Sequence, residues 1–100
     1  MKQVVLSADG DRKVYAVPDQ VADHLEDYCL WFCTRWLWES PHAAPYRVGG
    51  VLRYDEADFI RYLNRWVFPH QPSSLVENLG WVGYDEALPP PYRDCPQFNF

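Results

Sequence analysis

The stretch from Tyr28 to Trp38, YCLWFCTRWLW, restricts the fold most, because as a helix it is apolar on every side. With about 100° of rotation per residue, one stripe holds Val21, Leu25, Tyr28, Cys29, Phe32 and Trp36, and the opposite side holds Leu30, Trp31, Leu37 and Trp38. One core covers only one of these sides. We expect the other to be covered either by the tail and hairpins of the chain itself or by a partner.

Length and composition indicate a single compact domain over residues 1–100. The chain has 100 residues, of which 48% are hydrophobic and 17% aromatic, and domains commonly contain about 100–150 residues. The segments described below mix strands and helices without regular alternation. The sequence therefore predicts a small α+β domain.

Charge and apolar patterning argue against several classes of protein. The formal net charge of −5 disfavours non-specific binding to nucleic acid or to anionic membranes. No run approaches the ~20 apolar residues of a membrane span, and the first residues lack the apolar core of a secretory signal. Three cysteines in this setting predict reduced thiols in the cytoplasm.

The first 41 residues predict a β-hairpin followed by a long central helix. Lys2–Leu6 and Arg12–Val17 are β-prone and flank an Asp-Gly pair, which suits a tight turn. Pro18 and Asp19 then begin the helix. We expect it to end near Ser40–Pro41, because proline disfavours a helical residue before it.

The middle of the chain predicts a second, short hairpin and a shorter helix. Tyr46–Val48 and Val51–Tyr54 flank two glycines that tolerate positive φ. Asp55 caps the helix, and Pro69 ends it. Apolar side chains recur with helical spacing at Phe59, Ile60, Leu63, Trp66 and Val67.

The last third predicts one more short helix and a docked tail. Ser74–Glu77 has the pattern of a capping box, with Gly80 as the end of the helix. Residues 85–100 contain four prolines and should be irregular. The final Phe98–Phe100 predicts that this proline-rich tail packs against the domain.

Three cysteines and one histidine are the candidates for metal or thiol chemistry. Cys29 and Cys33 lie at i and i+4 on a helix, and Cys95 can approach from the tail to complete a three-thiolate site. His24 lies in an Asp-His-x-x-Asp patch that can share a ligand or a proton. The chain lacks paired Cys-x-x-Cys knuckles, and burial in a core is the alternative for each thiol. We expect no cofactor and no metal.

Two further patterns bear on partners. Pro89–Tyr92 contains Pro-Pro-x-Tyr, which resembles the ligand of WW domains, and the alternative is a tail laid across the surface. Aromatics alternate with arginines in Trp31–Trp38 and Arg61–Trp66, an arrangement that can stack bases. Between Arg35 and Arg65, five arginines face four acids, so we expect no direct binding of nucleic acid.

These observations favour a small cytoplasmic protein-binding module, an adaptor or a stoichiometric inhibitor of a protein machine, rather than an enzyme. We expect its partner to contact Leu30, Trp31, Leu37 and Trp38. The alternatives are a small metal- or thiol-dependent enzyme and a structural protein that dimerises through the aromatic face. In being short, acidic, aromatic and without motifs, the chain is similar in type to accessory proteins of phages and mobile elements, including anti-CRISPR proteins.

Overall fold

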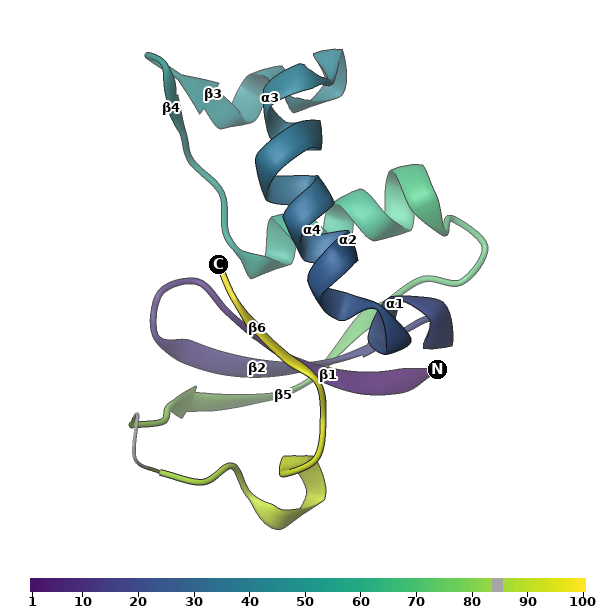
Figure 1. Cartoon of the computed structure of the whole chain (residues 1–100), viewed down its shortest axis with the longest axis vertical. Helices are drawn as coiled ribbons and strands as arrows, with labels where there is room; N and C mark the ends of the chain where they lie inside the picture. Colours follow the sequence, from purple (N-terminus) through teal and green to yellow (C-terminus); the bar gives the residue numbers. More distant parts are fainter. Residues whose placement is uncertain (84–85) are drawn as a thin grey trace.

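The computed structural model describes residues 1–83 and 86–100 as one α+β domain (Figure 1). Its elements in chain order are β1 (Lys2–Ser7), β2 (Asp11–Val17), α1 (Asp19–Asp23), α2 (Leu25–Trp31), the π-helical segment η1 (Phe32–Trp36), α3 (Leu37–Glu39), the 3₁₀ helix η2 (Pro41–Tyr46), β3 (Arg47–Val48), β4 (Val51–Leu52), α4 (Glu56–Tyr62), the π-helical segment η3 (Leu63–Val67), β5 (Ser74–Trp81), the 3₁₀ helix η4 (Pro90–Tyr92) and β6 (Gln97–Asn99).

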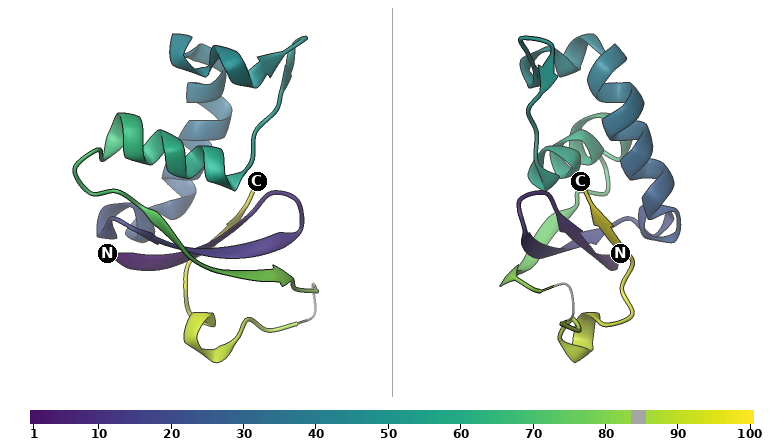
Figure 2. Two further views of the ribbon diagram at one scale, coloured as in Figure 1. Left: turned by 180° about the vertical axis from the view of Figure 1, so that it is seen from behind. Right: turned by 60° about the vertical axis from the view of Figure 1, so that its left-hand side comes forward.

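A mixed four-stranded sheet in the order β5-β2-β1-β6 separates two hydrophobic clusters. Val4 and Leu6 of β1 belong to the large cluster formed with the helices, whereas Val5 packs with Val14 and Leu88. Side chains alternate between the faces of a strand, so the second cluster lies on the opposite face. Figure 2 shows the helices over one face of the sheet and η4 over the other.

Both predicted hairpins are confirmed. β1 and β2 pair antiparallel, with Val4 opposite Tyr15. β3 and β4 form a separate two-stranded ribbon. Gly49 and Gly50 between them have φ angles of 59° and 79°, which matches the positive φ that a two-residue hairpin turn requires at both positions.

The single long helix predicted from Asp19 onward is wrong in two places. The chain leaves helical geometry at His24, where φ is −134° and ψ is 41°, so α1 and α2 are separate helices. Further along, Leu37 N–H donates to the Phe32 carbonyl, a five-residue step that marks the π turn of η1. Neither deviation has a proline or glycine to signal it in the sequence.

The helix predicted at Ser74–Glu77 is also wrong, because this segment is the edge strand β5. The Asn64 side chain donates to the Ser73 carbonyl (3.0 Å) and accepts from its N–H (2.6 Å). This pair of bonds fixes the chain just before β5, where β2 offers a free edge. The local signals favoured a helix, since Leu75, Val76 and Leu79 recur with helical spacing, but pairing with the edge of β2 overrides them. Gly80, the predicted end of the helix, has a φ of 68° at a bulge opposite Arg12.

The predicted tail docks across both faces of the sheet. After η4, strand β6 pairs parallel with β1, and Phe100 joins the core cluster on the helix side. The Tyr92 hydroxyl donates to Glu77 on β5 at 2.6 Å. Asp85, where the irregular tail was predicted to begin, lies outside the described residues.

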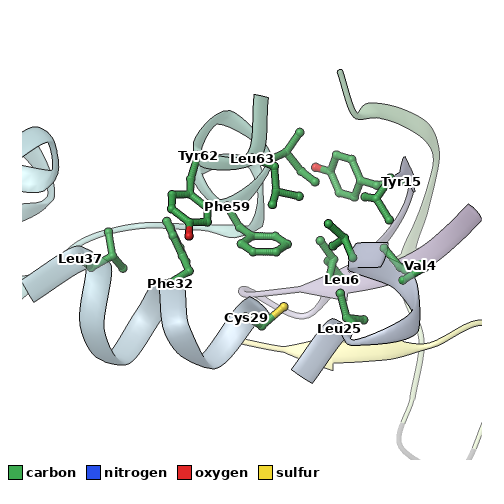
Figure 3. Close-up of a cluster of buried hydrophobic side chains, with 14 of the residues drawn as sticks. Val4, Leu6, Tyr15, Leu25, Cys29, Phe32, Leu37, Phe59, Tyr62 and Leu63 are labelled. Atoms are coloured by element: carbon green, nitrogen blue, oxygen red, sulfur yellow. The ribbon is translucent and has the colours of Figure 1, made fainter. Parts of the chain in front are cut away.

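Phe32 belongs to the large cluster, where it lies beside Phe59 and Tyr62 (Figure 3). It is fully buried and contacts rings from η1, α4, the end of the chain and the loop before α4. Their centroids lie within 5.1–6.0 Å, at Trp36, Tyr54, Phe59, Tyr62 and Phe100. One side chain therefore joins segments that are far apart in the sequence.

A half-buried ion pair connects the sheet to α4. Lys13 Nζ on β2 lies 2.5 Å from Glu56 Oε1, and the Glu56 side chain is almost fully buried. The hydrogen bond to Glu56 raises the pKa of Lys13 above its ordinary value of 10.5, against the opposing effect of desolvation. The ammonium group is therefore charged at neutral pH and is the partner of a buried carboxylate.

We expect Lys13→Met to lower the free energy of unfolding by about 2 kcal/mol at pH 7, because it leaves the Glu56 carboxylate buried without its partner. A group whose pKa is raised by folding stabilises the native state fully below its unfolded-state pKa. The difference between wild type and variant should therefore be constant from pH 7 to 9, as measured by urea unfolding, and shrink as the pH rises past about 10.5.

Lys2→Met is the matched control, since Lys2 pairs with Asp23 at the exposed surface and its loss should change stability little. Equal unfolding free energies for Lys13→Met and wild type would show that the pair contributes nothing.

Candidate functional site

The outer face of α2, η1 and α3 carries three large exposed apolar side chains. Trp31 is 51% exposed, Trp38 50% and Leu30 41%. The outward orientation predicted from the sequence is confirmed for these three residues. We call them the Trp31–Trp38 face. Its binding of a partner stays a prediction.

The outward orientation predicted for Leu37, the fourth expected contact residue, is wrong, because Leu37 is fully buried in the large cluster. A π turn holds about one residue more than an α turn, so the residues after it are rotated back by about 100°. This rotation turns Leu37 into the core. It also brings Trp38 to within about 20° of Leu30 around the helix axis, and leaves Trp31 on the flank.

Two charged side chains on the helix surface, Arg35 and Glu39, hold Trp31 in place. The Arg35 guanidinium lies 4.9 Å from the centroid of the Trp31 ring, and Arg35 Nε lies 3.0 Å from Glu39 Oε1. Cation–π contacts of this kind restrict an exposed ring at little energetic gain. A side chain that is already ordered loses less entropy when a partner covers it.

A shallow hollow of about 310 Å³ lies beside Trp31, lined by Asp27, Tyr28, Trp31 and Tyr62. Three of these side chains are aromatic and one is a carboxylate. Glu26 and Asp27 are both exposed, and neither forms an ion pair within residues 1–83 and 86–100. The hollow therefore combines apolar walls with a negative rim.

Other exposed apolar side chains lie at the tip of the second hairpin, at Val48 and Val51, and on β5. Leu75 and Val76 are exposed on β5, and Trp81 at its end is 72% exposed. Sequence reasoning missed this edge because it predicted a helix there. The adjacent apolar residues Leu75 and Val76, the second of which is β-branched, were the available sequence signal for a strand.

Sequence reasoning also missed a cleft of about 260 Å³ between η2 and the outer side of α4 and η3. Its lining residues are Trp36, His42, Pro45, Tyr46, Arg61, Tyr62, Arg65 and Trp66. The alternation of arginine and aromatic residues from Arg61 to Trp66 was a partial signal, but the opposite wall comes from a distant segment. We call this the Arg61–Arg65 cleft.

The three thiols do not come together. Cys29 is buried in the large cluster and Cys33 packs beside it, whereas Cys95 packs in the second cluster across the sheet. Burial raises the pKa of Cys29 strongly and also raises that of Cys33. Both thiols are therefore protonated at neutral pH, whereas a metal ligand or a nucleophile needs to be a thiolate.

The Asp-His-x-x-Asp patch is also divided. His24 lies at the break between α1 and α2, and the Asp23 carboxylate is paired with Lys2 at 2.6 Å. In the part of the chain that the structure describes, no three His, Cys, Asp or Glu side chains are grouped as metal ligands.

The Pro-Pro-x-Tyr segment does not present the extended form that a WW domain binds. Pro90–Tyr92 is a 3₁₀ turn, and the Tyr92 hydroxyl is bonded to Glu77. Leu88, just before the motif, is buried under the sheet. The WW-ligand interpretation is therefore replaced by a structural one, in which the motif fastens the tail to β5.

No family model, no curated protein and no solved structure matches this chain. Within the described residues, none of the helices combines the length and the apolar character needed to cross a bilayer.

We expect Cys29 to react with an aromatic disulfide reagent much more slowly than Cys95 in the native protein at pH 8, because its thiol is buried and its pKa is raised. Mass spectrometry of samples quenched over time measures each site. The labelling rates of Cys33 and Cys95 should still increase with pH at pH 9, the ordinary pKa of a thiol, because the pKa of each is raised. All three should react alike in denaturant, and fast native labelling of Cys29 would contradict the packing described here.

Proposed function

We propose that this chain is a small protein-binding module, acting as an adaptor or a stoichiometric inhibitor, and that its partner covers the Trp31–Trp38 face. The observation that carries the proposal is the exposure of two tryptophans and Leu30 on the central helix. Tryptophan is enriched among the few residues that dominate binding energy at interfaces. Large apolar side chains grouped on a water-facing surface also favour association.

The helix face is a better candidate than the β5 edge. β5 contains two irregularities in its pairing with β2, and irregular pairing twists an edge strand away from further strands. The Glu77 side chain on β5 already accepts a hydrogen bond from the Tyr92 hydroxyl. By contrast, Trp31 is fixed by Arg35 beside a hollow that can receive a partner side chain.

The charge around the face defines the chemistry of the partner. Glu26 and Asp27 border Leu30 and Trp31, and the whole chain has a formal charge of −5. We infer a partner that offers an apolar pocket ringed by lysine or arginine, since complementary potentials speed encounter and select the binding orientation. A basic side chain suits the hollow, with its aromatic walls and the Asp27 carboxylate.

The proposal assigns the chain no catalytic role and no cofactor, and three free thiols suit the reducing cytoplasm expected from the sequence. A homodimer through the same face is the second candidate, supported by the same exposed tryptophans. The chemistry of the rim argues against it, because two copies would bring the same acidic side chains together.

A nuclease-treated pull-down from lysate of the source organism should recover one stoichiometric protein with the wild-type bait. Trp31→Ala and Trp38→Ala should each weaken this complex about thirtyfold, the effect of a hot spot worth about 2 kcal/mol. Calorimetry with the purified partner measures the change. Trp81→Ala is the matched control, since Trp81 is more exposed but lies on β5.

Equal recovery with wild type and the double Trp31→Ala/Trp38→Ala variant would overturn the proposal. Recovery of the bait chain alone, with a dimer mass in light scattering that the double variant loses, would establish the homodimer instead. Circular dichroism of each variant checks that the fold is retained.

Glu26→Lys/Asp27→Lys should slow association with the partner about tenfold at low salt and flatten its dependence on NaCl, because the negative rim steers a basic partner. Stopped-flow fluorescence of the tryptophans measures the rate. Asp94→Lys, an exposed acid on the tail, is the control and should leave the rate nearly unchanged. Faster association of the double-lysine variant would show that the partner surface is acidic.

A further inference from the structure

The Arg61–Arg65 cleft concentrates positive charge on an acidic protein. Arg61 and Arg65 lie one helical turn apart and both line the cleft. Arg61 Nη1 is bonded to Asp58 at 2.6 Å, but Asp58 also accepts the Asp55 N–H in the capping box. Arg65 has no ion pair among the described residues. Like charges one turn apart destabilise a helix, and a bound anion relieves this repulsion.

The rest of the lining is aromatic. Trp36 lies 4.8 Å from Tyr62 and 6.5 Å from Tyr46 between ring centroids, so these three rings form a continuous wall. The Tyr46 hydroxyl is protonated at neutral pH like that of any tyrosine, and burial, together with the nearby Asp58 carboxylate, raises its pKa further. The cleft therefore combines π surfaces with donors.

The opposite wall is held in place by two separate contacts. The His42 ring stacks on Trp66, with centroids 3.9 Å apart and planes inclined by 21°. Arg47 Nη1 donates to the carbonyls of Leu37 (2.8 Å) and Ser40 (2.9 Å), which fixes the chain that leads into η2. The cleft is thus formed before any ligand arrives, as small-molecule sites commonly are.

Volume limits what can enter. The cleft measures about 260 Å³, whereas a cavity of about 150 Å³ accommodates benzene. One aromatic ring with one charged substituent therefore fits within the cleft. The planar guanidinium of arginine binds carboxylate and phosphate through two parallel hydrogen bonds.

We propose that the Arg61–Arg65 cleft binds a small aromatic anion, a single ring that carries a carboxylate or a phosphate. The ring packs against Trp36, Tyr46 and Tyr62, and the anionic group pairs with Arg65 and Arg61. This site goes beyond the proposed function, because it contains none of the residues of the Trp31–Trp38 face. Tyr62 alone lines both the cleft and the hollow beside Trp31.

Titration with phenyl phosphate and with benzoate, followed by calorimetry and tryptophan fluorescence, tests the proposal. Both should bind saturably, and inorganic phosphate and benzyl alcohol should each bind about tenfold more weakly, since each offers only half of the recognised chemistry. Arg65→Gln and Arg61→Gln should weaken phenyl phosphate about tenfold. Arg53→Gln is the matched control, because this exposed arginine lies outside the cleft lining.

Two outcomes overturn the proposal: no saturable binding at millimolar concentration, or equal affinity in wild type and Arg65→Gln. Phosphotyrosine amide compared with the same residue inside a short neutral peptide distinguishes the source of the ring. Tighter binding of the peptide indicates a partner's side chain, and equal binding indicates a free small molecule. The Trp31→Ala/Trp38→Ala variant should keep its affinity for phenyl phosphate, so the failure of one proposal does not imply the failure of the other.

Discussion

The packing of Phe32 against Phe59 and Tyr62 is the contact on which the rest of the structure depends. The two helical segments that supply these rings touch the sheet from one side, and Phe100 closes the same cluster from the end of the chain. Once Phe32 is fixed inside, the opposite side of its helix is left exposed at Leu30, Trp31 and Trp38 by the described part of the chain. The exposed Trp31–Trp38 face is therefore a consequence of the core.

Local signals were enough to predict the hairpins and the capped helix at Asp55. The Asp-Gly and Gly-Gly pairs select tight turns, and Asp55 and Asp58 exchange side-chain and backbone hydrogen bonds within four residues. β5 was mispredicted because its conformation is set by Asn64 and by β2, both distant in the sequence. The break at His24 likewise has no local cause that a single sequence reveals.

The helical wheel placed Leu30 and Trp31 correctly because both precede the π turn, and Trp38 stays exposed because the rotation of about 100° carries it from one outward direction to another. It misplaced Leu37 because the π turn adds one residue in the middle of the pattern. Thr34, whose hydroxyl bonds to the Leu30 carbonyl, lies within this turn, but a threonine in a helix is too common to predict it. The Arg61–Arg65 cleft required η2 to fold back onto η3, which no sequence period encodes.

The pairing of β6 with β1 also determines when this fold can be completed. β1 emerges from the ribosome long before β6, its parallel neighbour, and this pair joins residues 5–7 to residues 97–99. Phe100 also contacts Phe32 and Phe59. During synthesis the hydrophobic cluster therefore stays open at one side until residues 97–100 have emerged from the ribosome, and its apolar side chains are exposed to other chains at that stage.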